Sequence, residues 1–261
     1  MTASRIVVGI LALGFALSSA SQERTPQNPS AKANAAYEVV SIKPSKPDAP
    51  GASEILPNGF RDAGTTIGNL VQNAFGITYE KQLVGLPPWT ESEPYDIEAK
   101  VDADTASRWQ KLTFRDRRKE EQPMMQALLT DRCKLKYHFE RKELPVYDLV
   151  IASSGSKMKE ASQDEVETAG IAGGDGGTLT GHALSMEGFI PTLSGTDGRV
   201  VVDKTGLGNK KFDFTLHWSP DAGSGPSLFT ALEEQLGLKL VPSKGTVNVL
   251  VVDQMERPSA N

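Results

Sequence analysis

The sequence predicts an α+β fold made of two tandem two-layer modules, each with two helices on one face of a small mixed sheet. Hydrophobic residues make up 38% and charged residues 23% of the 261 residues, a composition typical of a folded protein. Segments with apolar residues at helical spacing are interspersed with segments in which every second residue is apolar. The same order of elements, β-α-β-β-α-β-β, occurs on both sides of a stretch rich in Gly, Ser and acidic residues.

The N-terminal residues 1–20 have the pattern of a secretory signal peptide. Arg5 precedes an apolar run over 6–17, and small residues suited to cleavage follow at 18–20. The run is shorter than the ~20 residues that span a bilayer, so we expect cleavage and no transmembrane segment afterwards. An uncleaved anchor helix is the alternative. Residues 21–36 are polar and are expected to form a flexible tether, and the location is expected to be secreted or periplasmic.

The first module is predicted over 37–154. An extended piece at 59–62 leads to a helix that is capped by Thr66 and ends at Gly76. Short and alternating strands follow at 82–84 and 95–101, and then a second helix after Pro123. The module ends in a predicted β-hairpin, with strands at 135–139 and 146–151 and a turn at 142–143.

The second module is predicted over 178–261, after a linker at 155–177. An extended piece at 178–183 leads to a helix that is capped by Ser185 and ends at Gly195. The later elements are strands at 199–202 and 212–218, a helix at 228–236 and a hairpin of 238–241 with 247–252, whose turn lies at 244–245. The apolar positions expected in the two cores are Ile67, Leu70, Val71, Phe75, Leu128, Leu129, Phe189, Ile190, Leu193, Leu228, Leu232 and Leu236.

A basic segment at 105–121 has no counterpart in the second module. Positive residues outnumber negative ones from Arg108 to Lys142, although the whole chain has a net charge of −5. A docking surface for an acidic protein, a phosphate head group or an anionic glycan is one interpretation, and a solvated helix surface is the other. Trp89, in a proline-rich loop, is either a further contact or packs on the core. The candidate contact residues are Trp89, Arg108, Lys111, Arg115, Arg117, Arg118 and Lys119.

Few residues suit catalysis or metal binding. Cys133 is the only cysteine, which excludes a disulfide framework, and a buried inert thiol is expected. The three histidines, His138, His182 and His217, are far apart in sequence, and no G-x-S-x-G, H-E-x-x-H or G-x-G-x-x-G motif occurs. We therefore predict no catalytic residue, no cofactor and no metal ligand. The acidic net charge argues against nucleic-acid binding.

Carboxylates alternate with apolar residues on the predicted strands. Asp96 and Glu98 share one face of a strand, and Asp213 and Thr215 share a face of another. This pattern favours a polar, solvent-facing surface. A pair of carboxylates for glycoside hydrolysis is the alternative.

Several long stretches, among them YEVVSIKPS, LPPWTESEPYDIEAK, LPVYDLVIA and VLVVDQMERPSAN, resemble a paralogous family of secreted soil-bacterial proteins that carry a domain of unknown function. The resemblance covers about residues 37–261. Members are also fused behind membrane-sensor peptidases of the antibiotic-responsive type, which implies an extracytoplasmic sensing or binding role. The repeated unit is similar in pattern to the short N-terminal module of secretins and TonB-dependent receptors, which docks other periplasmic proteins.

Together these features predict a non-enzymatic binding protein whose partner is an envelope protein, a peptide or an anionic glycan. Exposed strands of such modules can accept an added strand from a partner. A hydrolase of envelope or extracellular polymers, which uses carboxylates or His217, is the first alternative. A structural surface protein is the second.

Overall fold

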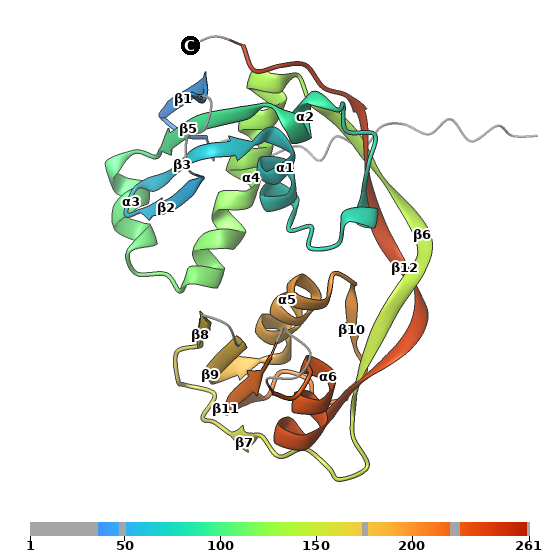
Figure 1. Ribbon diagram of the computed structural model, residues 1–261. Coiled ribbons are helices and arrows are strands. Elements are labelled where there is room, and N and C mark those ends of the chain that lie inside the picture. Colours follow the sequence, from blue (N-terminus) through green and yellow to red (C-terminus); the bar gives the residue numbers. More distant parts are fainter. Residues whose placement is uncertain (1–35, 47–50, 174–176, 220–224, 260–261) are drawn as a thin grey trace, which may run out of the picture.

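The computed structural model describes residues 36–46, 51–173, 177–219 and 225–259. The predicted signal peptide 1–20 and nearly all of the predicted tether 21–36 lie outside these residues. Two lobes lie one above the other and are joined along one side by a long two-stranded ribbon (Figure 1). The α+β class predicted from the sequence is confirmed.

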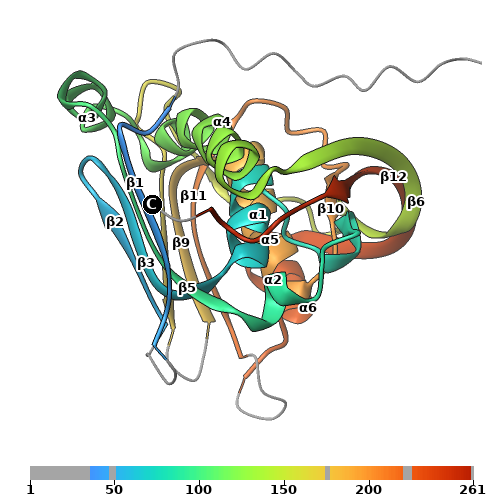
Figure 2. The ribbon, with the colours of Figure 1, turned by 90° about the horizontal axis from the view of Figure 1, so that it is seen from above.

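The first lobe contains an antiparallel four-stranded sheet in the order β1-β5-β3-β2. Helices α1 and α4 cover one face of this sheet and share its apolar core (Figure 2). Two short helices, α2 and α3, complete the lobe. The elements are β1 (Val39–Pro44), β2 (Ala52–Leu56), β3 (Gly59–Thr66), α1 (Ile67–Phe75), α2 (Trp89–Ser92), β5 (Pro94–Lys100), α3 (Ala103–Trp109) and α4 (Phe114–Cys133).

The two helices of this lobe differ in how well local sequence predicts them. α1 begins and ends as expected, because the Thr66 side chain accepts a hydrogen bond from the Asn69 N–H and Gly76 adopts a left-handed conformation with φ 63°. α4 is longer than predicted, since it starts at Phe114 and continues through Pro123. The basic segment 105–121 is therefore regular structure, formed by most of α3, a short turn and the first part of α4.

The second lobe has a sheet in the corresponding order, β7-β11-β9-β8, which is also antiparallel. α5 ends at Asp197, before the left-handed Gly198, and not at Gly195 as predicted. The segment 155–177, expected to be a linker, contains β7 and β8; both lie at sheet edges, so they lack the apolar pattern of a buried strand. The elements are β7 (Lys159–Glu160), β8 (Thr168–Gly173), β9 (Gly177–Ser185), α5 (Met186–Asp197), β11 (Lys211–Trp218), α6 (Leu228–Ala231) and η2 (Leu232–Leu236).

The ribbon replaces both predicted hairpins. β6 (Lys136–Ile151) and β12 (Leu238–Gln254) each run straight through the predicted turn and pair with one another, from Ile151 opposite Leu238 to Tyr137 opposite Val252. Two short strands add to its sides in parallel, β10 (Val201–Asp203) on β6 and β4 (Leu83–Val84), which follows η1 (Glu80–Gln82), on β12. This third sheet is the mixed one, whereas the sheets of the lobes are purely antiparallel.

The hairpin prediction was wrong because the two hairpins exchange strands. The turn residues expected at 142–143 and 244–245 lie in mid-strand, with Lys142 opposite Val247 and Gly245 opposite Leu144. The N-terminal end of β6 and the C-terminal end of β12 pack on the first lobe, through Tyr137 and Val252 respectively. The other ends complete the second lobe, so each lobe contains a strand from both halves of the chain.

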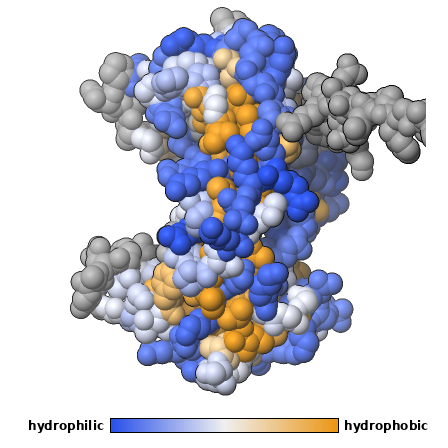
Figure 3. All heavy atoms as spheres, turned by 90° about the vertical axis from the view of Figure 1, so that its right-hand side faces the viewer, coloured by the Kyte–Doolittle hydropathy of each residue, from blue (hydrophilic) through white to orange (hydrophobic). Residues whose placement is uncertain are grey.

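The cores lie within the lobes and, in smaller part, inside the curl of the ribbon. All twelve predicted core positions pack in the lobe cores, although Phe75 and Ile190 are only partly buried. Val146, Val247 and Val249 form a separate cluster in mid-ribbon. Hydrophilic residues predominate at the waist between the lobes on the ribbon side (Figure 3). Among the described residues, no helix has the length and hydrophobicity needed to cross a bilayer.

Cysteines introduced at Glu143 and Thr246 should form a disulfide under mild oxidation, because these exposed residues lie opposite one another in the ribbon. The measurement is the mobility of the chain on a non-reducing gel. The control is Glu143→Cys with Lys239→Cys, since Lys239 lies opposite Val150 near the far end of the ribbon. Separate hairpins would place positions 143 and 246 in two unrelated turns, and the first pair would then stay reduced.

The thiol of Cys133 should be unreactive in the folded protein. Cys133 is fully buried, and this burial raises its pKa to about 12. Iodoacetamide at pH 8 is expected to label the native chain far more slowly than the chain in guanidinium chloride, as followed by mass spectrometry. Equal labelling rates in both conditions would contradict the buried position.

Candidate functional site

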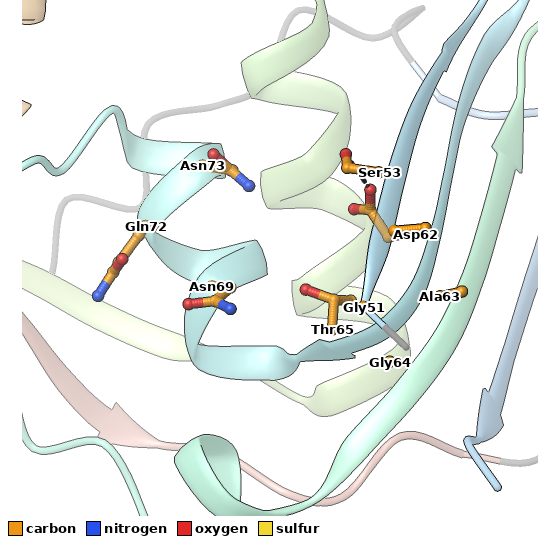
Figure 4. A pocket seen from close by; sticks show the side chains of 10 residues that line it. Gly51, Ser53, Asp62, Ala63, Gly64, Thr65, Asn69, Gln72 and Asn73 are labelled. Atoms are coloured by element: carbon orange, nitrogen blue, oxygen red, sulfur yellow. Dashed lines mark hydrogen bonds between the residues drawn. The ribbon is translucent and has the colours of Figure 1, made fainter. Parts of the chain in front are cut away.

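A polar hollow of about 490 Å³ in the first lobe is the candidate site. It lies between the beginning of β2, the second half of β3 and α1 (Figure 4). Its volume is within the range of small-molecule and side-chain pockets. The polar side chains that line it are Ser53, Asp62, Thr65, Asn69, Gln72 and Asn73.

The local sequence explains how these side chains come together. On α1, Ile67, Leu70, Val71 and Ala74 are buried, so the remaining positions form a polar face with Asn69, Gln72 and Asn73. Asn73 points from this face toward the strands that carry Ser53 and Asp62 (Figure 4). Asp62 lies two residues after the core residue Phe60 on β3, and successive residues of a strand alternate between faces. Asp62 is therefore on the helix-covered face and is 8% exposed.

Burial dominates the electrostatics of the hollow. It raises the pKa of Asp62, and the hydrogen bond that the Ser53 hydroxyl donates to the carboxylate at 2.5 Å opposes this shift. Within the described part of the chain, no lysine or arginine forms an ion pair with this carboxyl group. A buried carboxylate without a cation is costly, so the hollow favours a ligand that supplies positive charge.

A second polar group, formed by Tyr37, Arg117 and the buried Glu121, lies near Asp62. Burial raises the pKa of Glu121, although Arg117 and Arg118 oppose the shift, and burial followed by the charge of Glu121 raises the pKa of Tyr37. The Tyr37 hydroxyl and Glu121 Oε1 have no hydrogen-bond partner among the described groups. Arg117 Nη2 lies 3.6 Å from Glu121 Oε1, so the charge of Glu121 is paired within this group.

The lining of the hollow provides groups for hydrogen bonding. Its described residues contain one carboxyl group and no histidine or cysteine. Two carboxyl groups on opposite sides of a substrate are the usual requirement for glycoside hydrolysis. The side-chain amides provide both hydrogen-bond donors and acceptors, which suit a polar group of a ligand.

Two of the predicted contact residues form ion pairs, Arg108 within the first lobe and Arg115 with the second lobe. Arg108 Nη2 lies 2.8 Å from Glu120 Oε2, which also accepts a hydrogen bond from the Trp109 indole at 2.9 Å. Arg115 connects the lobes, because its Nη1 donates to both carboxylate oxygens of Glu167 and to Ser185 Oγ, each at 3.1 Å.

The other predicted contacts are dispersed. Arg117 donates to the Gly59 carbonyl at 2.6 Å and lies over the Trp109 ring, and Lys119 pairs with Glu187 of the second lobe at 3.4 Å. Arg118 donates to Asn73 Oδ1 at 3.1 Å and is the member nearest the hollow.

Lys111 is exposed, and Trp89 packs against the first core with Arg257 over its ring. Most of these side chains thus contact other parts of the chain, and their role in partner binding stays a prediction.

The surroundings of Asp96 and Glu98, which were considered for hydrolysis, favour the ionised form of both carboxyl groups. Hydrogen bonds from Ser45 and the Gly64 N–H lower the pKa of Asp96, and Lys100 and Arg61 lower that of Glu98. His217 is in hydrogen-bond contact with Thr178. A general acid at neutral pH needs a raised pKa, so Asp96 and Glu98 do not suit that role.

Asp62, Ser53 and the amides of α1 were not predicted as site residues from the sequence. An acidic residue at an inward position of the alternating stretch GFRDAGTT was the available signal for Asp62. Three amide side chains at spacings of three and four residues on one predicted helix were the signal for the opposite wall.

Substitution of Arg115 should weaken the contact between the lobes. Its side chain and that of Glu167 are 26% and 15% exposed, so Arg115→Ala leaves a partly desolvated carboxylate without its cation. We expect the free energy of unfolding in urea to fall by about 1–3 kcal/mol. Lys111→Ala, at an exposed position of the same basic segment, should change it by less than ~0.5 kcal/mol. Equal effects of the two substitutions would contradict a specific contact.

Comparison with known proteins gives a family but no characterised relative. No curated protein and no solved structure matches the chain. One family model, described as "Protein of unknown function (DUF3738)", matches residues 68–255. The match begins in α1 and ends just after β12, so it includes the helices and β5 of the first lobe, all of the second lobe and the ribbon, whereas β1, β2 and β3 precede it. The resemblance to a family with a domain of unknown function is thereby confirmed, and the chain belongs to the DUF3738 family.

Proposed function

We propose that this chain is an exported, non-enzymatic binding protein and that it binds an extended peptide at the edge of the first lobe. The hollow with its buried Asp62, open beside the edge strand of the sheet, is the observation that carries the proposal. Export is supported by the signal-peptide pattern of residues 1–20. We also propose that the chain is a member of the secreted paralogous family of soil-bacterial proteins that its sequence resembles.

The edge strand β2 offers the backbone groups for such a peptide. It lies at one end of the sheet order, pairs among the described strands with β3 alone, and exposes every residue from Ala52 to Ile55. An edge strand presents free N–H and C=O groups that an extended segment can pair with, while pockets beside the edge select side chains. Ile55, which is 59% exposed, would be covered by an added strand.

The hollow would determine which side chain of the peptide is accepted. It begins at Gly51, Ala52 and Ser53, so a strand added to β2 can direct a side chain into it. A lysine or arginine side chain would provide the cation that the Asp62 carboxylate lacks, and the amides of α1 would bind its remaining N–H groups. The proposed ligand is therefore an extended peptide with a basic residue at the position beside β2.

Selection from a phage-displayed library of short linear peptides tests the proposal on the full chain. Enriched peptides should carry lysine or arginine, and binding should slow amide hydrogen exchange in Ala52–Leu56. Asp62→Asn keeps the acceptor for Ser53 but removes the charge, so it should weaken binding of these peptides about tenfold or more. Glu91→Gln, which removes an exposed charge elsewhere in the same lobe, is the matched control and should leave binding unchanged.

The same peptides should show a defined pH dependence. Binding of a basic side chain needs the ionised carboxylate, and the pKa of Asp62 is raised. Affinity should therefore fall with decreasing pH, starting above the pH at which an ordinary aspartate is protonated. Absence of enriched peptides, an equal loss in Glu91→Gln, or cleavage of the bound peptide detected by mass spectrometry would overturn the proposal.

A further inference from the structure

Glu165, His182 and Asp213 converge on one point at the surface of the second lobe. They come from the turn before β8, from β9 and from β11, respectively. His182 Nδ1 lies 3.0 Å from Asp213 Oδ1, and His182 Nε2 lies 3.2 Å from Glu165 Oε2. One ligand atom of each side chain lies within 4.8 Å of the others, and the described residues contain no second group of three such side chains that meets this distance.

A β-bulge positions two of these side chains. The register of β9 against β11 shifts between Phe212 and Phe214, and Ala183 takes a left-handed conformation with φ 46°. The Ala183 N–H donates to Asp213 Oδ1 at 2.9 Å, which fixes the carboxylate beside His182. The first lobe has a corresponding bulge at Gly64, whose N–H donates to Asp96 Oδ1 at 3.0 Å, but there Ala63 precedes the left-handed residue. The histidine is thus an addition to a shared backbone arrangement.

Contacts within the turn position the third side chain. The Ser162 N–H donates to Glu165 Oε1 at 3.3 Å, which leaves Oε2 directed at His182. Lys211 Nζ donates to the carbonyls of Gln163 and Glu165, at 2.6 and 2.7 Å, and holds the turn against β11. Lys159 Nζ lies 3.9 Å from Asp213 Oδ2, and its side chain is 81% exposed, so it is free to move away from an arriving cation.

We propose that Glu165, His182 and Asp213 bind one divalent transition-metal cation, with zinc as the best match. One imidazole nitrogen and two carboxylate oxygens are a ligand set that zinc accepts, whereas magnesium and calcium prefer oxygen ligands alone. The ion would replace the imidazole contacts with the carboxylates and tie the turn before β8 to β9 and β11. Three protein ligands leave a tetrahedral zinc ion one position for water or for a donor atom of another molecule.

Isothermal titration calorimetry of the full chain with zinc chloride tests the proposal, with protein made without a polyhistidine tag. One ion per chain should bind with a dissociation constant in the micromolar range or below, and magnesium chloride should give no comparable signal. His182→Gln and Asp213→Asn should each weaken zinc binding at least tenfold. Both positions keep hydrogen-bonding groups in the variants, and circular dichroism and thermal unfolding check that the variants fold.

His138→Gln is the matched control. His138 also lies between two carboxylates, with Nδ1 3.0 Å from Asp253 and Nε2 3.3 Å from Glu140, but it belongs to no convergent group of three. This variant should bind zinc as the unsubstituted chain does. Lack of saturable zinc binding below ~1 mM, or an equal loss in His138→Gln and in folded His182→Gln, would overturn the proposal.

Discussion

The antiparallel pairing of β6 with β12 is the constraint on which the rest of the structure depends. Segments about a hundred residues apart in sequence must meet in one register from Ile151 opposite Leu238 to Tyr137 opposite Val252. Only then do Leu250 and Val252 complete the first core, while Leu238 and Leu240 complete the second. Because such distant pairing requires the closure of a long loop, its entropic cost is high, and the apolar ends of the ribbon provide the compensating burial.

The ribbon and the contact between the lobes act at opposite sides of the molecule. Along the ribbon, apolar side chains anchor each end and leave a hydrophilic waist between the lobes (Figure 3). At the start of α4, Arg115 and Lys119 bind Glu167 and Glu187 around the beginning of α5. The basic segment, which stands out in sequence as a surface for a partner, thus contributes to the internal contact between the lobes. A charged contact of this kind fixes the orientation of one lobe against the other, whereas the burial of the apolar strand ends contributes most of the stability.

Features fixed by neighbouring residues could be predicted, and features fixed by distant ones could not. Thr66 and Ser185 cap helices as expected, because a cap depends on the next three residues. The strand exchange was missed because a hairpin and an exchanged pair satisfy the same alternating pattern and the same backbone hydrogen bonds. The hollow was missed for a related reason, since Asp62 and Asn73 face one another only after β3 and α1 pack. His182 and Asp213 could not be linked in advance, because the bulge at Ala183 has no glycine to mark it.

The interleaved strands also change what a break in the backbone would do. The segment 155–177, with its Gly-rich composition, is where a protease or a gene fusion would be expected to divide the chain. A cut there would leave β6 on one fragment and β12 on the other, still paired along their whole length. The two fragments would stay associated as one folded unit, and neither fragment would fold as an independent domain.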